Sequence, residues 1–225
     1  MQMGNTSYES AKDIPDVVPV FPLSGALLLP RSHLPLNVFE PRYIAMIDDA
    51  LATHRVIGMV QPRFDGAVGD DPDAPMLCSV GALGRIVSFQ ETGDGRYLIQ
   101  LGGICRFRIL EEVDEGELFR RCRITATPFE DDLRNVESDV DVDRAALIEA
   151  FQNYLDANDV EADWKVVRAA SNEALVNTLA MMSHYSPAEK QALLEAPNLK
   201  ARAATLVAIT EMELARQSGD KPTLN

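Results

Sequence analysis

The chain has 225 residues, of which 46% are hydrophobic and 25% charged, which is typical of a globular protein with a substantial core. Lys and Arg number 21 and Asp and Glu 35, so the formal net charge is −14. This excess repels phosphate backbones and anionic lipids, so we expect neither a nucleic-acid nor a membrane partner. No apolar run approaches the ~20 residues that span a bilayer, and the first residues lack the pattern of a secretory signal. Composition therefore predicts a cytoplasmic protein and does not indicate an activity.

Cysteine and histidine are rare and scattered. An odd number of distant cysteines, with no CxxC pair, implies no disulfide framework; they are Cys78, Cys105 and Cys122. The histidines have no spacing typical of metal ligands; they are His33, His54 and His184. We therefore expect no metal and no cofactor.

The first half of the chain has the pattern of a β-rich subdomain. Residues 1–16 are polar and unpatterned and predict a flexible arm. Short apolar runs then predict strands at 17–23, 26–30, 36–39, 56–60, 80–90, 96–101, 105–109 and 122–126. Pro41 is placed to open a helix whose apolar face holds Ile44, Ile47 and Leu51. We expect this β-rich part to cover residues 17–128.

Two predicted strands alternate apolar residues with arginines. Cys105 and Phe107 alternate with Arg106 and Arg108, and the same pattern recurs with Arg121 and Arg123. Period two predicts that the arginines face outward. One interpretation is a basic strip that binds an acidic peptide or a phosphate. The five acids of 111–117 favour the other interpretation, in which the arginines are compensated locally.

The second half of the chain has helical periodicity. An acidic linker is expected at 129–142, a helical bundle at 143–217 and a tail at 218–225. Ser171 is a candidate break within the helical stretch 164–182, and Ser186 with Glu189 has the capping-box pattern. The acidic stretch 65–73 lacks the ligand positions of a calcium-binding loop, so we interpret it as a solvated connection. The predicted class is α+β, with a pseudo-barrel around one helix followed by a helical bundle.

Three motifs resemble a known family. They are Val18-Pro-Val-Phe-Pro-Leu23, Leu34-Pro-Leu-Asn-Val-Phe-Glu-Pro-Arg-Tyr43 and Gly102-Gly-Ile-Cys-Arg-Phe-Arg-Ile109. Together with Lys190-Gln-Ala-Leu-Leu-Glu195 and Arg202 they are similar to the N-terminal, substrate-binding domain of Lon proteases in its stand-alone bacterial form. The resemblance extends over residues 17–215. It implies a protein that recognises unfolded or client polypeptides, or docks to a protease or chaperone component, rather than one that cuts them.

The catalytic features of full-length Lon proteases are not found in this sequence. There is no GxxxxGK[ST] phosphate loop, and no Ser–Lys dyad can be assigned. We therefore expect no enzymatic activity. Two alternatives stay open, a hydrolase with an unrecognised site and a structural scaffold or homo-oligomer held through the helical half.

A candidate peptide-binding surface lies at the turn from a predicted strand into a predicted helix. This corner holds two aromatic and two charged side chains: Phe39, Glu40, Arg42 and Tyr43. An alternative is that Glu40 faces the helix dipole and Arg42 pairs with it or with Asp48 or Asp49.

Overall fold

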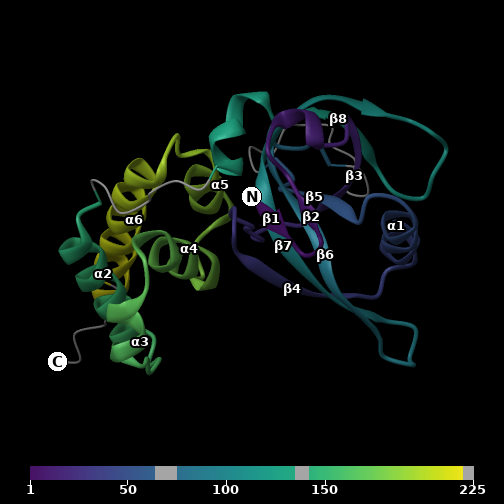
Figure 1. Ribbon diagram of the computed structural model, residues 1–225. Coiled ribbons are helices and arrows are strands. Elements are labelled where there is room, and N and C mark those ends of the chain that lie inside the picture. The colour runs from purple at the N-terminus through teal and green to yellow at the C-terminus, as the bar shows by residue number, and fades with distance from the viewer. Residues whose placement is uncertain (64–74, 135–141, 220–225) are drawn as a thin grey trace. The chain divides into compact units, whose positions relative to one another are not determined.

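The computed structural model describes residues 1–63, 75–134 and 142–219 (Figure 1). Strands dominate the first part of the sequence and helices the second, so the predicted α+β class is confirmed. Among the described residues, 1–134 together with Ser186–Leu194 form one compact unit, and 142–185 together with 195–219 form another. The expected division between β-rich and helical parts therefore has an exception, because the segment 186–194 belongs with the strands.

The first unit contains a six-stranded sheet. Its strands are β3 (Val17–Pro22), β4 (His33–Val38), β5 (Val56–Val60), β6 (Val80–Glu91), β7 (Tyr97–Val113) and β8 (Arg121–Thr125). The order is β4-β7-β6-β5-β3-β8, and β7 also pairs with β8. The sheet therefore closes on itself through five strands, while β4 is attached to β7 at the edge. Helix α1 (Pro41–Ala52) lies between β4 and β5 in sequence and contacts β3 and β5.

Strand β7 is a single element of 17 residues, where the sequence suggested two separate strands. The apolar run 26–30, expected to be a strand, is instead a buried connection that lies against β7. Arg31 N–H donates to the Gly103 carbonyl at 2.9 Å, and Gly103 N–H donates to the Ser32 carbonyl at 2.8 Å. A Cβ atom on Gly103 would lie 2.1 Å from the Leu29 carbonyl oxygen, so only glycine permits this approach.

The N-terminal residues are part of the fold rather than the flexible arm that their polarity suggested. They form the strand pair β1 (Gln2–Met3) and β2 (Thr6–Ser7), followed by the 3-10 helix η1 (Ala11–Asp13). Met3, Tyr8 and Ile14 are buried, and Arg85 donates a hydrogen bond to the Tyr8 hydroxyl. Three apolar residues spaced this widely follow neither a helical nor a strand period, so their burial could not be predicted from hydrophobic periodicity.

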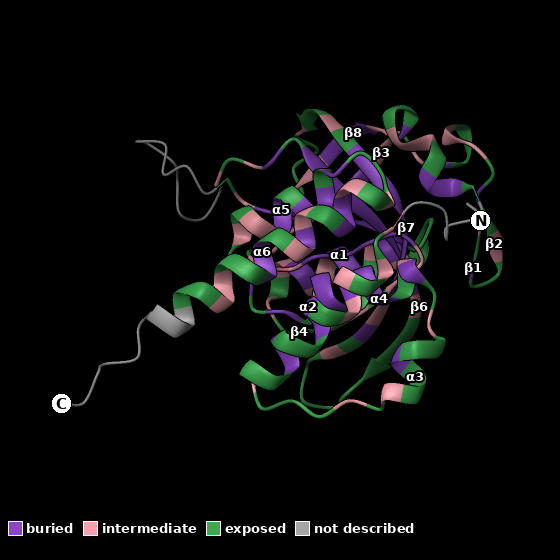
Figure 2. Cartoon of the chain, turned by 90° about the vertical axis from the view of Figure 1, so that its left-hand side faces the viewer, coloured by how far each residue is buried: buried purple, intermediate pink, exposed green. Residues whose placement is uncertain are grey.

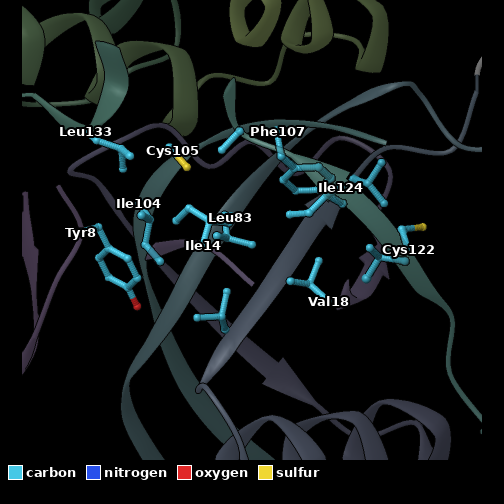
Figure 3. Close-up of a cluster of buried hydrophobic side chains, with 14 of the residues drawn as sticks. Tyr8, Ile14, Val18, Leu83, Ile104, Cys105, Phe107, Cys122, Ile124 and Leu133 are labelled. Atoms are coloured by element: carbon cyan, nitrogen blue, oxygen red, sulfur yellow. The ribbon is translucent and has the colours of Figure 1, made fainter. Parts of the chain in front are cut away.

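These N-terminal side chains complete a hydrophobic cluster inside the first unit. Figure 3 shows Tyr8 and Ile14 beside Leu83 and Ile104, with Phe107 and Ile124 further along the same cluster. Phe107 is fully buried, and a Cβ on Gly81 would lie 2.5 Å from its ring. The ring therefore fills the space that glycine leaves on β6.

Helix α1 begins at Pro41, as predicted, but its buried face is rotated from the expected one. The fully or nearly fully buried residues are Tyr43, Met46, Ile47 and Ala50, whereas Ile44 and Leu51 are half-buried. The reason is tertiary: the Tyr43 ring packs on Phe21 of β3 with 4.2 Å between centroids.

Helix α5 (Pro187–Glu195) is held on the β-rich unit by polar contacts. Gln61 donates to the Pro187 carbonyl at 3.0 Å and to Gln191 at 3.1 Å, and Gln191 donates to the Val80 carbonyl at 3.0 Å. The Lys190 ammonium donates to the Gly25 carbonyl at 2.9 Å, and burial lowers the pKa of Lys190. These contacts give a physical reason for grouping 186–194 with the strands. The Ser186–Glu189 capping box is present as predicted.

The second unit contains α2 (Arg144–Ala157), α3 (Trp164–Ala169), α4 (Asn172–Met182) and α6 (Leu199–Gly219). Ser171 separates α3 from α4 by capping α4, as expected from the sequence. Asp143 caps α2 in the same manner. In the described ranges, no helix combines the length and the apolarity that crossing a bilayer requires.

Candidate functional site

An exposed apolar patch lies where β4, β7 and β6 pair. Asn37 on β4 and Gln90 on β6 both pair in register with Leu98 on β7, and Pro35 pairs with Gln100. Residues directly opposite each other point to the same side of a sheet. Ile99 and Leu101 alternate with these positions and are buried, so Leu98 and its neighbours face outward.

We call Pro35, Phe39, Arg96 and Leu98 the outer patch. Phe39 directly follows β4 and is 62% exposed, and Leu98 is 42% exposed. The Arg96 guanidinium lies 5.9 Å from the centroid of the Phe39 ring and pairs with Asp94 at 3.3 Å. The patch therefore offers apolar side chains to solvent beside one compensated positive charge. Such surfaces commonly bind other polypeptides.

The opposite side of the same strands supports the patch. The rings of Phe89 and Tyr97 meet edge to face with 4.8 Å between centroids. The Tyr97 hydroxyl donates to Asp48 of α1 at 3.0 Å, which links the end of the β6–β7 hairpin to the helix. This link and the strand pairing hold Arg96 and Leu98 in place.

The four residues predicted to bind peptide have different environments. Phe39 is exposed, whereas Tyr43 is only 8% exposed, and burial raises the pKa of its hydroxyl. Arg42 donates to the Glu40 carboxylate at 2.9 Å, and its guanidinium lies 4.7 Å from the Tyr43 ring centroid. Glu40 caps the start of α1 without a side-chain cap bond. The pairing of Arg42 with Glu40 is the structural alternative noted from the sequence, and binding by these four residues stays a prediction.

Sequence reasoning missed Pro35, Arg96 and Leu98. Arg96 and Leu98 lie near a hairpin turn, and a single leucine at the end of an apolar strand looks like a core residue when read alone. The available signal was the alternation of Leu98 with Ile99, which places one of them outward. The sequence does not reveal which side is covered.

The predicted outward strip of arginines is wrong at Arg106. This side chain is buried and forms a two-bond pair with Asp132 of the 3-10 helix η2 (Thr127–Leu133), at 2.8 and 2.9 Å. Arg106 also donates to the Leu194 carbonyl at 3.3 Å and lies 4.7 Å from the Phe129 ring centroid. The alternation of apolar residues and arginines predicted that Arg106 faces solvent. This prediction was wrong because η2 and α5 cover that side of β7. The expected linker 129–142 therefore starts as an ordered, partly buried segment.

Arg121 and Arg123, two further arginines of the strip, are compensated locally, as favoured from the sequence. Arg123 pairs with Glu111 at 2.8 Å, and Arg121 pairs with Asp49 at 2.9 Å and with Glu117. Arg120 adds a pair with Glu112. The acids of 111–117 thus neutralise neighbouring strands, which leaves little net charge for an anionic ligand. The acidic stretch 65–73 lies outside the described residues.

The cysteines and histidines do not form a reactive site. Within the described part of the chain, no three His, Cys, Asp or Glu side chains lie close enough to hold a metal ion. All three cysteines are buried, and none of them forms a disulfide. Burial raises the pKa of Cys122 to about 11 and that of Cys105 still further. A thiol with a raised pKa is protonated at neutral pH and is a poor nucleophile.

This environment predicts slow thiol labelling. We expect Cys105 and Cys122 in the folded chain to react with a maleimide at pH 7.5 at least ~100-fold more slowly than in the denatured chain. Mass spectrometry of peptides after timed labelling measures the rate at each cysteine. Equal rates in the folded and denatured chains would contradict the burial of the thiols.

Comparison with known proteins identifies the family. The family model of the ATP-dependent protease La (LON) substrate-binding domain matches residues 17–211. The chain belongs to this family. The Lon substrate-binding resemblance found in the three sequence motifs is therefore confirmed.

Relatives of the chain are Lon proteases. Lon protease of Anaeromyxobacter dehalogenans is 37% identical over 145 residues, which are 64% of this chain and 16% of that protein. Lon protease 2 of Myxococcus xanthus is 31% identical over 192 residues, 85% of this chain and 23% of that protein. The chain thus corresponds to a quarter or less of the length of these relatives.

Two solved structures share the fold. A Lon N-terminal domain protein from Xanthomonas campestris has a TM-score of 0.59 at 22% identity, with 85% of this chain and 97% of that chain covered. The N-terminal domain of Mycobacterium avium complex Lon protease has a TM-score of 0.61 at 19% identity, with 87% and 98% covered. At these identities the similarity establishes the architecture alone.

Proposed function

We propose that the chain is a non-catalytic module that binds unfolded or client polypeptides, and that the outer patch contributes to the contact surface. The single observation that carries the proposal is the exposure of Phe39 and Leu98 on one side of the β4–β7 pair in a substrate-binding-domain fold. Apolar side chains kept in water on an ordered sheet provide a site for the apolar residues of an unfolded segment.

The position of β4 supports this mode of binding. In the strand order β4 lies at the end, with β7 as its neighbour. An extended peptide can pair with the edge of a sheet through its backbone while its side chains contact the surface on either side. Pro35 removes one N–H donor from this strand, so contacts to Phe39 and Leu98 would carry more of the affinity than a full ladder of hydrogen bonds.

The wider setting follows from the same proposal. Clients would be unfolded segments, and a protease or chaperone component would be the partner that receives them. The chain would work in the cytoplasm, a reducing compartment in which its three cysteines stay thiols. Glu40, Arg42 and Tyr43 would form the end of the surface next to Phe39, where Arg42 and Glu40 are already paired with each other.

The test is binding of a permanently unfolded, fluorescently labelled model protein, followed by anisotropy. We expect Phe39→Ser and Leu98→Ser each to weaken binding about 5-fold to 20-fold, because a lost apolar contact of this size is worth about 1–2 kcal/mol. Arg42→Ala is expected to change binding less than 3-fold, because its guanidinium is already engaged with Glu40.

Leu118→Ser is the matched control, because Leu118 is 73% exposed but lies between β7 and β8, away from the outer patch in sequence. It is expected to leave binding unchanged. Weakening by Leu118→Ser as strong as that by Phe39→Ser would mean that binding follows general surface hydrophobicity. Unchanged binding in both patch variants would remove the outer patch from the proposal.

A further inference from the structure

The helical unit has an open groove between α2 and α6. Its volume is about 400 Å³. The α6 side of the groove consists of small apolar residues between two charged ones, in the order Lys200, Ala203, Ala204, Val207, Ala208 and Glu211. Asp143 and Ala146 contribute the α2 side. Figure 2 shows exposed and intermediate residues on the described part of α6, interspersed with buried ones. Small side chains on an exposed helix allow a second helix to approach closely.

The sequence of this helix face is complementary to itself. A two-fold axis between Thr205 and Leu206 exchanges position 200 with 211, 203 with 208, 204 with 207, and 199 with 212. Lys200 then faces Glu211, and the alanines and Val207 face one another. Leu199, which is half-buried, faces Met212, which is 54% exposed. The two-fold axis therefore places opposite charges next to each other at the ends of the face and apolar side chains next to each other elsewhere.

We propose that a second copy of the chain occupies this groove, with the two α6 helices antiparallel across a two-fold axis. A two-fold interface uses the same surface on both copies, so one Lys200–Glu211 contact is made twice. Antiparallel helices also place opposite ends of their dipoles side by side. The net charge of −14 on each copy opposes association. The two Lys200–Glu211 contacts act against this repulsion, so the stability of the dimer is expected to depend on them.

Charge reversal tests the register. Sedimentation velocity over a range of concentrations gives the dimer Kd for the full chain. Lys200→Glu and Glu211→Lys are each expected to raise this Kd at least ~10-fold, because each creates two like-charge contacts. The double variant Lys200→Glu/Glu211→Lys is expected to return the Kd to within ~3-fold of the original, because it restores both contacts with the charges exchanged.

Lys165→Glu is the matched control for Lys200→Glu. Lys165 is exposed on α3 of the same unit, and its replacement changes the net charge by the same amount. It is expected to leave the Kd unchanged. A monomer at about 0.2 mM chain, or a double variant no better than the single ones, would overturn the proposal.

Cross-linking tests the direction of the helices. Mixing the Lys200→Cys and Glu211→Cys variants is expected to give a disulfide-linked dimer on mild oxidation. Each variant alone is expected to give none, because eleven residues of helix separate the two thiols by ~16 Å. The native cysteines are buried and do not compete. Cross-linking of Lys200→Cys with itself, or no cross-link in the mixture, would overturn the antiparallel arrangement. Both positions are exposed, and circular dichroism checks that the variants are folded.

Discussion

Asp132→Ala is expected to lower the free energy of unfolding of the β-rich unit by about 3–5 kcal/mol. The substitution removes both carboxylate oxygens from the Arg106 guanidinium and from the Arg106 N–H, which donates to the same carboxylate at 3.0 Å. Arg106 would then be a buried charge without its counter-ion, and desolvation makes that state costly. Urea unfolding followed by circular dichroism measures the change.

The neighbouring acid provides the control. Asp131 pairs with Arg134 at 2.8 Å, but the two side chains are 85% and 65% exposed. Because solvent screens such pairs, Asp131→Ala is expected to cost less than about 1 kcal/mol. The double variant Arg106→Met/Asp132→Leu is expected to be more stable than Asp132→Ala, since it leaves no charge in the buried site. Equal losses for Asp131→Ala and Asp132→Ala would contradict the role assigned to burial.

Gly103→Ala is expected to destabilise the same unit by about 3 kcal/mol. The added Cβ would lie 2.1 Å from the Leu29 carbonyl oxygen, and the residues that follow Leu29 are held to Gly103 of β7 by two backbone hydrogen bonds, at Arg31 and Ser32. The connection 24–32 would have to move away from the strand, and its buried leucines would move with it. Urea unfolding measures the loss, and hydrogen exchange at Arg31 and Gly103 reports whether the local bonds open.

Gly102→Ala is the control for Gly103→Ala. It separates the cost of a contact with backbone from the cost of replacing either glycine of the Gly102-Gly103 pair. Its Cβ would meet the Met3 sulfur at 2.2 Å, a contact with a flexible side chain rather than with backbone. Met3 can change rotamer, so we expect a loss of about 1 kcal/mol. A loss at Gly102 as large as that at Gly103 would show that backbone contact is not the deciding factor.

Much of the local structure could be predicted from short patterns. Pro41 at the start of α1, Ser171 between α3 and α4, and the Ser186–Glu189 box are all set by neighbours within four residues. The hairpin of β6 and β7 was likewise visible as two apolar runs joined by glycines. Such features depend on local backbone preferences and hydrogen bonds, which the sequence displays directly.

The predicted peptide-binding residues and the outer patch share only Phe39. Phe39 was named from the sequence and is exposed, whereas Tyr43 was named with it and is in the core. The difference arises from Phe21, 22 residues earlier, whose ring occupies the position next to Tyr43. Leu98 joins Phe39 only because β4 and β7 pair in a particular register. No local pattern contains that register.

The sequence by itself determined the α+β class, the order of most helices and strands, and the family. It did so because periodicity, capping residues and motifs are properties of neighbouring residues. The tertiary structure alone decided which residues of a given period face water. Asp132 is one example. Its acidic surroundings in the sequence predict a solvated linker, but it is the buried partner of Arg106, 26 residues away. Burial depends on what covers a residue, and in this chain the cover comes from distant segments such as η2 and α5.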